Sequence, residues 1–158
     1  MEEIYQILET VKDPEIPVIS IVDLGIVREV RKMNGDIEID ITPTYTGCPA
    51  LDVIPVLIRE AMASEGYSEV RVKNILSPAW TTDWISESGL QKLKEFGIAP
   101  PVEKTSDKSF LLQEPKTVPC PFCNSENTRL VSQFGSTPCK ASYQCNDCLE
   151  PFDYFKCH

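Results

Sequence analysis

Four cysteines near the end of the chain are spaced as two C-x-x-C pairs. Cys120 and Cys123 form the first pair, Cys145 and Cys148 form the second, and 21 residues separate the pairs. Two such pairs can bring four thiolates to the corners of a tetrahedron, and the intervening chain fits a β-hairpin. A domain of about 40 residues has too small a core to fold without such a crosslink. We therefore expect a zinc ribbon with one structural Zn²⁺.

Two other chemistries could use the same cysteine spacing. Four thiolates also suit iron, so an iron site is the competing interpretation of the same spacing. A redox-active C-x-x-C motif is disfavoured, because two pairs occur together and neither lies in a thioredoxin-like strand–helix–strand pattern.

Three further residues of the tail could bind metal. Cys139, Cys157 and His158 could form a second site or replace a ribbon ligand, and we keep Cys139 as a candidate additional ligand. For Cys157 and His158 an unliganded, frayed terminus is the favoured interpretation. His158 is the only histidine in the chain, which argues against cysteine-hydrolase chemistry through a Cys–His pair.

Cys48 is the one cysteine outside this tail, and it lies in the segment 42–50, TPTYTGCPA. An alternating strand pattern precedes the segment and an apolar helical pattern follows it. The unpaired N–H groups and positive field of a helix start favour a thiolate, and Thr44 and Thr46 add hydroxyl groups beside it. The alternative is a small, buried and unreactive thiol in a capping turn.

The composition favours a cytoplasmic protein with reduced thiols. No apolar run of the 158-residue chain approaches the roughly 20 residues of a membrane span. The start, Met1-Glu2-Glu3, is acidic and leads into an amphipathic pattern, which is unlike a signal peptide. Seven cysteines in a reducing compartment indicate metal binding instead of a disulfide framework.

The charge disfavours two classes of partner. The chain carries a net charge of −9, of which −8 lies in residues 1–97 and −1 in the remainder. Neither part offers the basic surface that phosphate groups attract, so we expect neither nucleic acid nor an anionic membrane surface as a partner.

The hydrophobic pattern predicts an α+β protein. We expect an α-β-β-α-β-α domain with a mixed three-stranded sheet over residues 1–97, a linker over 98–118 and a small zinc-ribbon β domain over 119–158. The helices of the first domain are expected at 2–12, from Leu51 to Gly66, and at 83–96; its strands are expected at 26–32, 37–41 and 69–75. The ribbon strands are expected at 128–134, 141–144 and 152–155.

Three details of the first domain are specific enough to test. Ile37, Ile39 and Ile41 alternate with acidic residues, which is typical of a half-buried strand after the Asn34-Gly35 hairpin signal. A strand, a helix and a second strand in one sheet imply a parallel pair. Pro55 should kink its helix or delay the start of its regular part.

The last helix of the first domain and the tryptophans before it give two more expectations. Leu90, Leu93 and Phe96 should face inward along that helix. Trp80 and Trp84 are expected to be plain core, with a roof over a Cys48 site as the alternative.

Four segments of the first domain resemble the iron–sulfur assembly domain that includes SufT-type proteins. The matching segments are, in order along the chain, 13–17 (DPEIP), 23–27 (DLGIV), 42–49 (TPTYTGCP) and 77–83 (SPAWTTD). The resemblance implies that Cys48 matters for iron–sulfur maturation. It also places Asp13, Asp23, Thr44 and Thr46 in the motifs that the family shares.

The tail resembles a second family. The segments 134–141 (FGSTPCKA) and 150–156 (EPFDYFK), with Cys145 between them, are similar to the C-terminus of the PaaD-like, or D-type, subunits of phenylacetyl-CoA epoxidase, an enzyme also called phenylacetate-CoA oxygenase. The resemblance implies an accessory protein in phenylacetate degradation, associated with a di-iron oxygenase component and an iron–sulfur flavin reductase. The chain has no Glu-x-x-His pair, so it lacks the di-iron carboxylate pattern and is not expected to catalyse the epoxidation.

Our main hypothesis is a metallocofactor maturation factor in which Cys48 transiently holds iron or an iron–sulfur cluster. One cysteine supplies one thiolate, so a homodimer or a ligand from the oxygenase partner would be needed to hold a cluster. The alternative is a structural docking subunit of the oxygenase complex with no metal transfer. A ribbon that binds nucleic acid is a weaker third hypothesis, because residues 119–158 contain only Arg129, Lys140 and Lys156 against four acidic residues.

Overall fold

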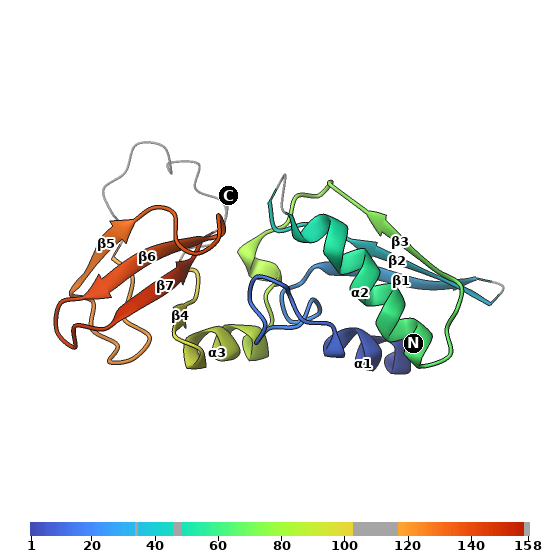
Figure 1. The fold of residues 1–158 in the computed structure, drawn as a ribbon, viewed down its shortest axis with the longest axis horizontal. Coiled ribbons are helices and arrows are strands. Elements are labelled where there is room, and N and C mark those ends of the chain that lie inside the picture. Colours follow the sequence, from blue (N-terminus) through green and yellow to red (C-terminus); the bar gives the residue numbers. More distant parts are fainter. Residues whose placement is uncertain (34, 46–48, 103–116, 157–158) are drawn as a thin grey trace. The chain divides into compact units, whose positions relative to one another are not determined.

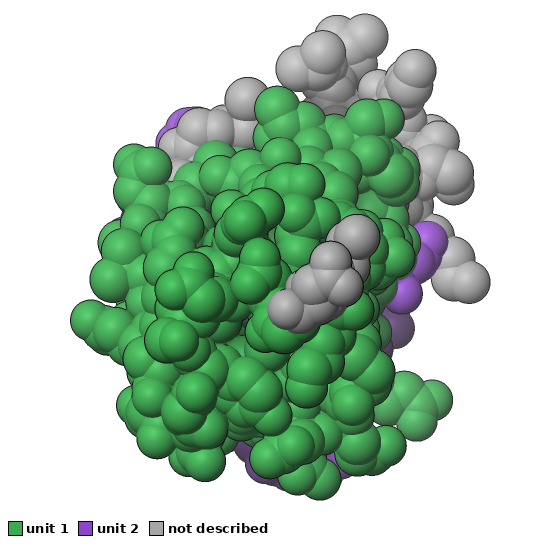
Figure 2. Space-filling model, turned by 90° about the vertical axis from the view of Figure 1, so that its right-hand side faces the viewer, with its two compact units in different colours: residues 1–80, 84–89 green, residues 81–83, 90–158 purple. Residues whose placement is uncertain are grey.

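The computed structural model describes residues 1–33, 35–45, 49–102 and 117–156 (Figure 1). The chain divides into two compact units, coloured separately in Figure 2. The first unit comprises Met1–Trp80 and Trp84–Gly89, and the second comprises Thr81–Asp83 and Leu90–His158. Each unit has its own sheet, which confirms the expected α+β domain followed by a small β domain.

The first unit is built on a three-stranded mixed sheet. Its strands are β1 (Val27–Met33), β2 (Asp36–Ile41) and β3 (Val70–Asn74), in the order β1-β2-β3. β1 and β2 are antiparallel, whereas β2 and β3 are parallel, as the strand–helix–strand pattern predicted.

Two helices accompany this sheet. They are α1 (Glu2–Thr10) and α2 (Ala50–Ser64), and α2 contacts both α1 and β3 (Figure 1). Ile37, Ile39 and Ile41 of β2 are each at most 1% exposed, so the alternation correctly identified the buried face. α2 begins at Ala50 and continues through Pro55, so the expected delay of its regular part is wrong.

The opposite face of β2 carries an ion-pair network centred on Arg31. Its guanidinium donates to the carboxylates of Glu29, Glu38 and Asp40, at 2.5, 2.6 and 2.6 Å. Asp40 is buried in spite of its charge, and Arg31 compensates that charge. Lys73 of β3 lies 2.6 Å from the second oxygen of Glu38 and, with Arg31, lowers the pKa of that carboxyl.

The single helix expected over residues 83–96 is interrupted. A short 3₁₀ turn, η1 (Thr82–Trp84), is followed by α3 (Glu87–Glu95). The break occurs because the Ser86 hydroxyl accepts the backbone N–H of Gly89 at 2.9 Å and so caps α3. Leu93 is fully buried as expected, but Phe96 is 56% exposed, so its inward placement was wrong.

Trp80 has a structural role in the first unit. It is buried, and its indole N–H donates to the carbonyl of Leu24 at 2.9 Å. This agrees with the core interpretation of that tryptophan. Trp84 is half-buried, and the guanidinium of Arg28 lies 3.4 Å from the centre of its ring.

The second unit is a four-stranded sheet. Its strands are β4 (Ile98–Ala99), β5 (Thr128–Ser132), β6 (Lys140–Cys145) and β7 (Pro151–Phe155), in the order β4-β7-β6-β5. β6 is antiparallel to both β5 and β7, and β4 is parallel to β7. The core of this unit contains the following buried residues: Ala99, Val118, Cys120, Ala141, Tyr143, Cys145 and Phe152.

Strand β4 lies at the start of the segment expected to be a linker, residues 98–118. Residues 103–116 of that segment are outside the described part of the chain. The domain limits 1–97 and 119–158 therefore stay a prediction. None of the helices in the described residues is long and apolar enough to cross a membrane.

The Glu38 ion pair predicts a pH-dependent loss of stability in the first unit. Because its folded pKa is lowered, the Glu38 carboxylate stabilises the fold above pH about 4.5, and this contribution is lost as the pH falls through the lowered pKa. Lys73→Gln should therefore be less stable than wild type at pH about 7, and the difference should disappear once the pH has fallen below the lowered pKa of Glu38. Urea unfolding followed by tryptophan fluorescence measures this, since Trp80 and Trp84 are the only tryptophans and both lie in the first unit.

The matched control for that variant is Arg71→Gln. Arg71 pairs with Asp36 at 3.3 Å on a more exposed part of the same sheet. The Arg71→Gln substitution should change the free energy of unfolding little, at neutral or at acidic pH. A Lys73→Gln protein with wild-type stability at neutral pH would contradict the assigned role of this pair.

Candidate functional site

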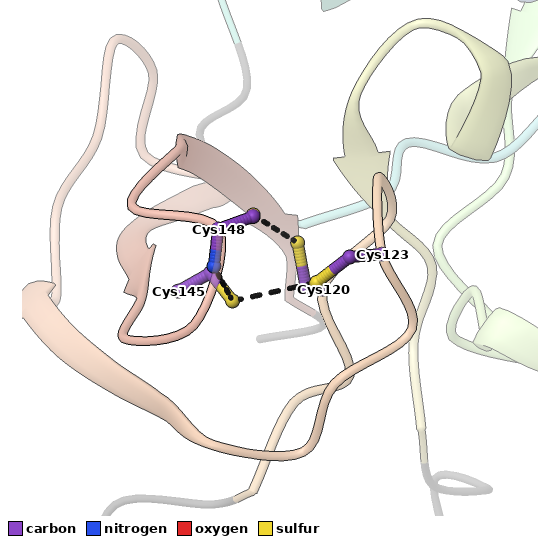
Figure 3. A group of neighbouring side chains, drawn as sticks. All are labelled: Cys120, Cys123, Cys145 and Cys148. Atoms are coloured by element: carbon purple, nitrogen blue, oxygen red, sulfur yellow. Dashed lines mark hydrogen bonds between the residues drawn. The ribbon is translucent and has the colours of Figure 1, made fainter.

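The sulfur atoms of Cys120, Cys123, Cys145 and Cys148 lie within 4.8 Å of one another (Figure 3). Two of the separations are 3.7 Å, between Cys120 and Cys148, and 3.6 Å, between Cys123 and Cys145. A tetrahedral ion with metal–sulfur bonds of about 2.3 Å places its sulfur ligands about 3.8 Å apart. The four thiols therefore have the geometry of a tetrathiolate metal site.

Local backbone structure aims the sulfurs of the two pairs at one another. In the first pair the N–H of Cys120 donates to Ser125 and the N–H of Asn124 donates to Cys120, both at 2.9 Å, and Asn124 adopts a left-handed conformation with φ 59°. In the second pair Cys145 ends β6, and the N–H of Cys148 lies 3.5 Å from its sulfur. Each C-x-x-C segment is thus a tight knuckle.

A polar network that the sequence analysis missed joins the two knuckles. The carboxylate of Asp147, within the second C-x-x-C pair, accepts the hydroxyl of Ser125 and, at 2.8 Å, the side-chain amide of Asn127. The side-chain amide of Asn146 donates to Asn127 at 2.9 Å. The sequence feature that could have indicated this network is the clustering of Asn, Asp and Ser residues around both C-x-x-C pairs.

The electrostatic environment gives two thiols of the site different pKa values. The backbone N–H of Cys148, opposed by burial, lowers the pKa of the Cys145 thiol to about 7. The N–H of Glu150 favours the Cys148 thiolate, but burial and the neighbouring sulfurs outweigh it and raise the pKa of Cys148 to about 12. One thiol therefore ionises easily while its neighbour retains a proton, because four thiolates repel one another without a cation.

Cys139 is separate from this group of four. It is buried near the opposite end of β6, where its sulfur lies 3.1 Å from the Thr137 hydroxyl and its carbonyl accepts the N–H of Lys156 at 2.9 Å. A role for Cys139 as an additional ligand stays a prediction. Cys157 and His158 lie outside the described residues.

Cys48 and Thr46 also lie outside the described residues. The structure does describe the start of α2, which follows Cys48 in the sequence and has no side-chain hydrogen bond from its N-cap residue, Pro49. Beside the start of α2, Asp13 and Thr44 line a cavity of about 10 Å³, which has room for about one water molecule. The other residues around it are Ile26, Ile41, Pro43, Ala50, Leu51 and Ile54.

Asp13 is buried and fixes the turn that brings it to this cavity. Its Oδ1 accepts the backbone N–H groups of Glu15 and Ile16, both at 2.9 Å, and its own N–H donates to Ile19 at 3.0 Å. Asp13 and Thr44, which sequence resemblance grouped together, are thus brought together by the fold.

Asp23 is not among the residues that line this cavity, and its hydrogen bonds are structural. Its Oδ1 accepts the Ser86 hydroxyl at 2.7 Å, its carbonyl accepts the Ser86 N–H at 2.8 Å, and its N–H donates to the Ser20 hydroxyl at 2.9 Å. Because Ser86 caps α3, Asp23 anchors the start of that helix.

The chain matches two family models. Residues 1–73 match the model described as iron-sulfur cluster assembly protein, and residues 104–156 match the PaaD zinc beta ribbon domain. The chain is also 48% identical over 157 residues to the putative D-type subunit of 1,2-phenylacetyl-CoA epoxidase from Escherichia coli. That alignment covers 99% of this chain and 93% of the relative.

The chain belongs to the family of D-type phenylacetyl-CoA epoxidase subunits. This D-type family member is also 35% identical to an Fe-S protein maturation auxiliary factor of Porphyromonas gingivalis, over 58% of this chain and 89% of the relative.

Solved structures support the fold. A domain of unknown function from Bacillus anthracis matches with a TM-score of 0.54 and 28% identity, covering 58% of this chain and 89% of that one. A conserved hypothetical protein from Thermotoga maritima matches with a TM-score of 0.50 and 26% identity, covering 58% and 91%.

The tetrathiolate geometry predicts which cysteines retain metal. Replacing Cys120 or Cys145 by serine should abolish stoichiometric metal binding and unfold the second unit, whose core contains both sulfurs. Metal analysis and NMR spectra of the purified full chain test this. Cys139→Ser is the control and should retain one ion per chain; loss of the ion in this variant would place Cys139 in the site.

The structural role of Asp23 predicts a difference between two substitutions. Asp23→Ala removes the acceptor of the Ser86 hydroxyl and should cost about 1–3 kcal/mol of unfolding free energy. Asp23→Asn keeps an acceptor oxygen and should cost less than about 1 kcal/mol. Urea unfolding measures both, and an equal loss in the two variants would show that the negative charge, not the hydrogen bond, is what matters.

Proposed function

We propose that this protein is an accessory subunit that assists iron or iron–sulfur cofactor assembly in a phenylacetyl-CoA epoxidase system. One observation carries the proposal: the chain aligns over 99% of its length with a D-type epoxidase protein, and over 58% of its length with an iron–sulfur maturation factor. It acts in the cytoplasm, where thiols stay reduced and available to metal.

The first unit supplies the cofactor-handling group in this proposal. Cys48 precedes α2 by two residues, at a helix start where backbone N–H groups and the helix dipole favour an anion. Asp13 and Thr44 line the cavity at this helix start, which supports a role for them in shaping the Cys48 site. Thr46 belongs to the same proposal because it lies two residues before Cys48 in the sequence.

Asp23 has a different place in the proposal. Asp23 forms hydrogen bonds with Ser20 and Ser86. It therefore affects the Asp13–Thr44 region only indirectly, by stabilising the fold of the first unit. We therefore assign it to the support of the site and not to iron binding.

The second unit supplies a stable docking module. We propose that its four cysteines hold zinc, because four thiolates in tetrahedral array with no open position are typical of structural zinc sites. The partner is the di-iron oxygenase component or the iron–sulfur reductase of the complex. Since one Cys48 thiolate cannot complete the coordination of a cluster, a second copy or the client must supply further ligands.

A purely structural docking subunit is the second candidate. It is favoured by the small size of the Asp13–Thr44 cavity, which leaves no preformed room for a cluster within the described residues. In that case Cys48→Ala would be silent, and removal of residues 119–158 would abolish assembly of the complex.

The proposal predicts that Cys48→Ser folds normally but leaves the client short of iron. The test coexpresses the oxygenase complex with wild-type protein, Cys48→Ser or the control Cys139→Ser, and measures iron in the purified complex. Cys139→Ser should match wild type, since that thiol is buried in the second unit. Full iron loading of the complex with Cys48→Ser would refute metal transfer and favour the docking subunit.

A further inference from the structure

Residues 94–99 lie outside both family matches, which cover 1–73 and 104–156. The structure nevertheless makes this segment part of the second unit. Through β4 it pairs with β7, joining Ile98 to Asp153 and Ala99 to Tyr154. The four-stranded sheet is therefore completed by residues that neither family model covers.

This segment also contacts the first cysteine knuckle directly. Lys94 Nζ donates to the side-chain oxygen of Asn124 at 2.9 Å, one residue after the ligand Cys123. The ring of Phe122, between the two ligands of the knuckle, packs on Gly97 so closely that a Cβ atom there would lie 2.8 Å from its Cζ.

The third contact is through the core. Ala99 is 1% exposed and belongs to the buried cluster that contains the ligands Cys120 and Cys145. A cavity of about 220 Å³ remains between Lys94, Ala99 and the knuckle, so the segment holds the knuckle at separate points and not along a continuous surface.

We propose that residues 94–99 form a clamp that slows release of the metal ion from the four cysteines. For an ion to leave, the Cys120–Cys123 knuckle must open, and opening breaks the Lys94–Asn124 and Gly97–Phe122 contacts. Because the clamp contacts stabilise the closed knuckle that binds the ion, the bound ion in turn stabilises the clamp against the ribbon. Lys94 and Gly97 are thus positioning residues of the metal site, independent of Cys48.

The test measures the rate at which the zinc-loaded full chain releases zinc to an excess of the chromogenic chelator 4-(2-pyridylazo)resorcinol. Gly97→Ala should release zinc about tenfold faster, since its Cβ would displace the exposed ring of Phe122 from the segment. Gly66→Ala is the matched control: Gly66 has a similar φ of +88°, against +82° for Gly97, but open space around its Cβ position. It should release zinc at the wild-type rate.

A milder pair of variants keeps the proposal testable if Gly97→Ala does not fold. Lys94→Met should accelerate release by about threefold, and Lys94→Arg, which can still donate to Asn124, should restore the wild-type rate. Hydrogen exchange of the zinc-loaded chains should show weaker protection of residues 94–99 in Lys94→Met than in wild type. Wild-type release rates in Gly97→Ala and Lys94→Met, or equal protection of residues 94–99 in the two zinc-loaded proteins, would overturn the clamp.

Discussion

Four cysteine sulfurs held within 4.8 Å of one another are the constraint on which the second unit depends. As thiolates they repel one another, and two of them lie in the core of a small unit, so a cation converts a repulsive cluster into a crosslink. The knuckle turns, the Asp147 network and the pairing of β6 with β7 all serve to aim these sulfurs at one point. The ribbon is therefore best understood as a fold built around an ion.

The first unit depends on a conventional core. The three isoleucines of β2 are buried on one face, while Arg31 gathers three carboxylates on the other and compensates the buried Asp40. The same strand ends shortly before Thr44, which lines one cavity with the buried Asp13. The segment that carries Cys48 thus lies in the sequence between the end of β2 and the start of α2.

The sequence predicted the buried face of β2 and the parallel pairing of β2 with β3, but it did not predict the break in the helix expected over residues 83–96 or the strand β4. The β2 alternation identified the strand face because side chains alternate along a strand, and the C-x-x-C spacing correctly grouped the four sulfurs that lie together. Phe96 was misplaced because α3 ends at Glu95, so the helical spacing no longer applies to Phe96, and β4 was missed because a two-residue strand has no period of its own. Resemblance grouped Asp23 with Asp13, but only the structure shows that Asp23 bonds to Ser86 and does not line the cavity.

The central claim, that Cys48 carries iron or a cluster, is tested most directly by iron and acid-labile sulfide analysis of protein purified without oxygen. Wild type and Cys48→Ser are compared in parallel, with zinc measured as the internal standard for an intact ribbon. The account predicts equal zinc in both proteins, with iron and sulfide in wild type alone. Iron in both proteins would contradict it, because the iron would then reside on the C-terminal cysteines and the zinc assignment would also be wrong.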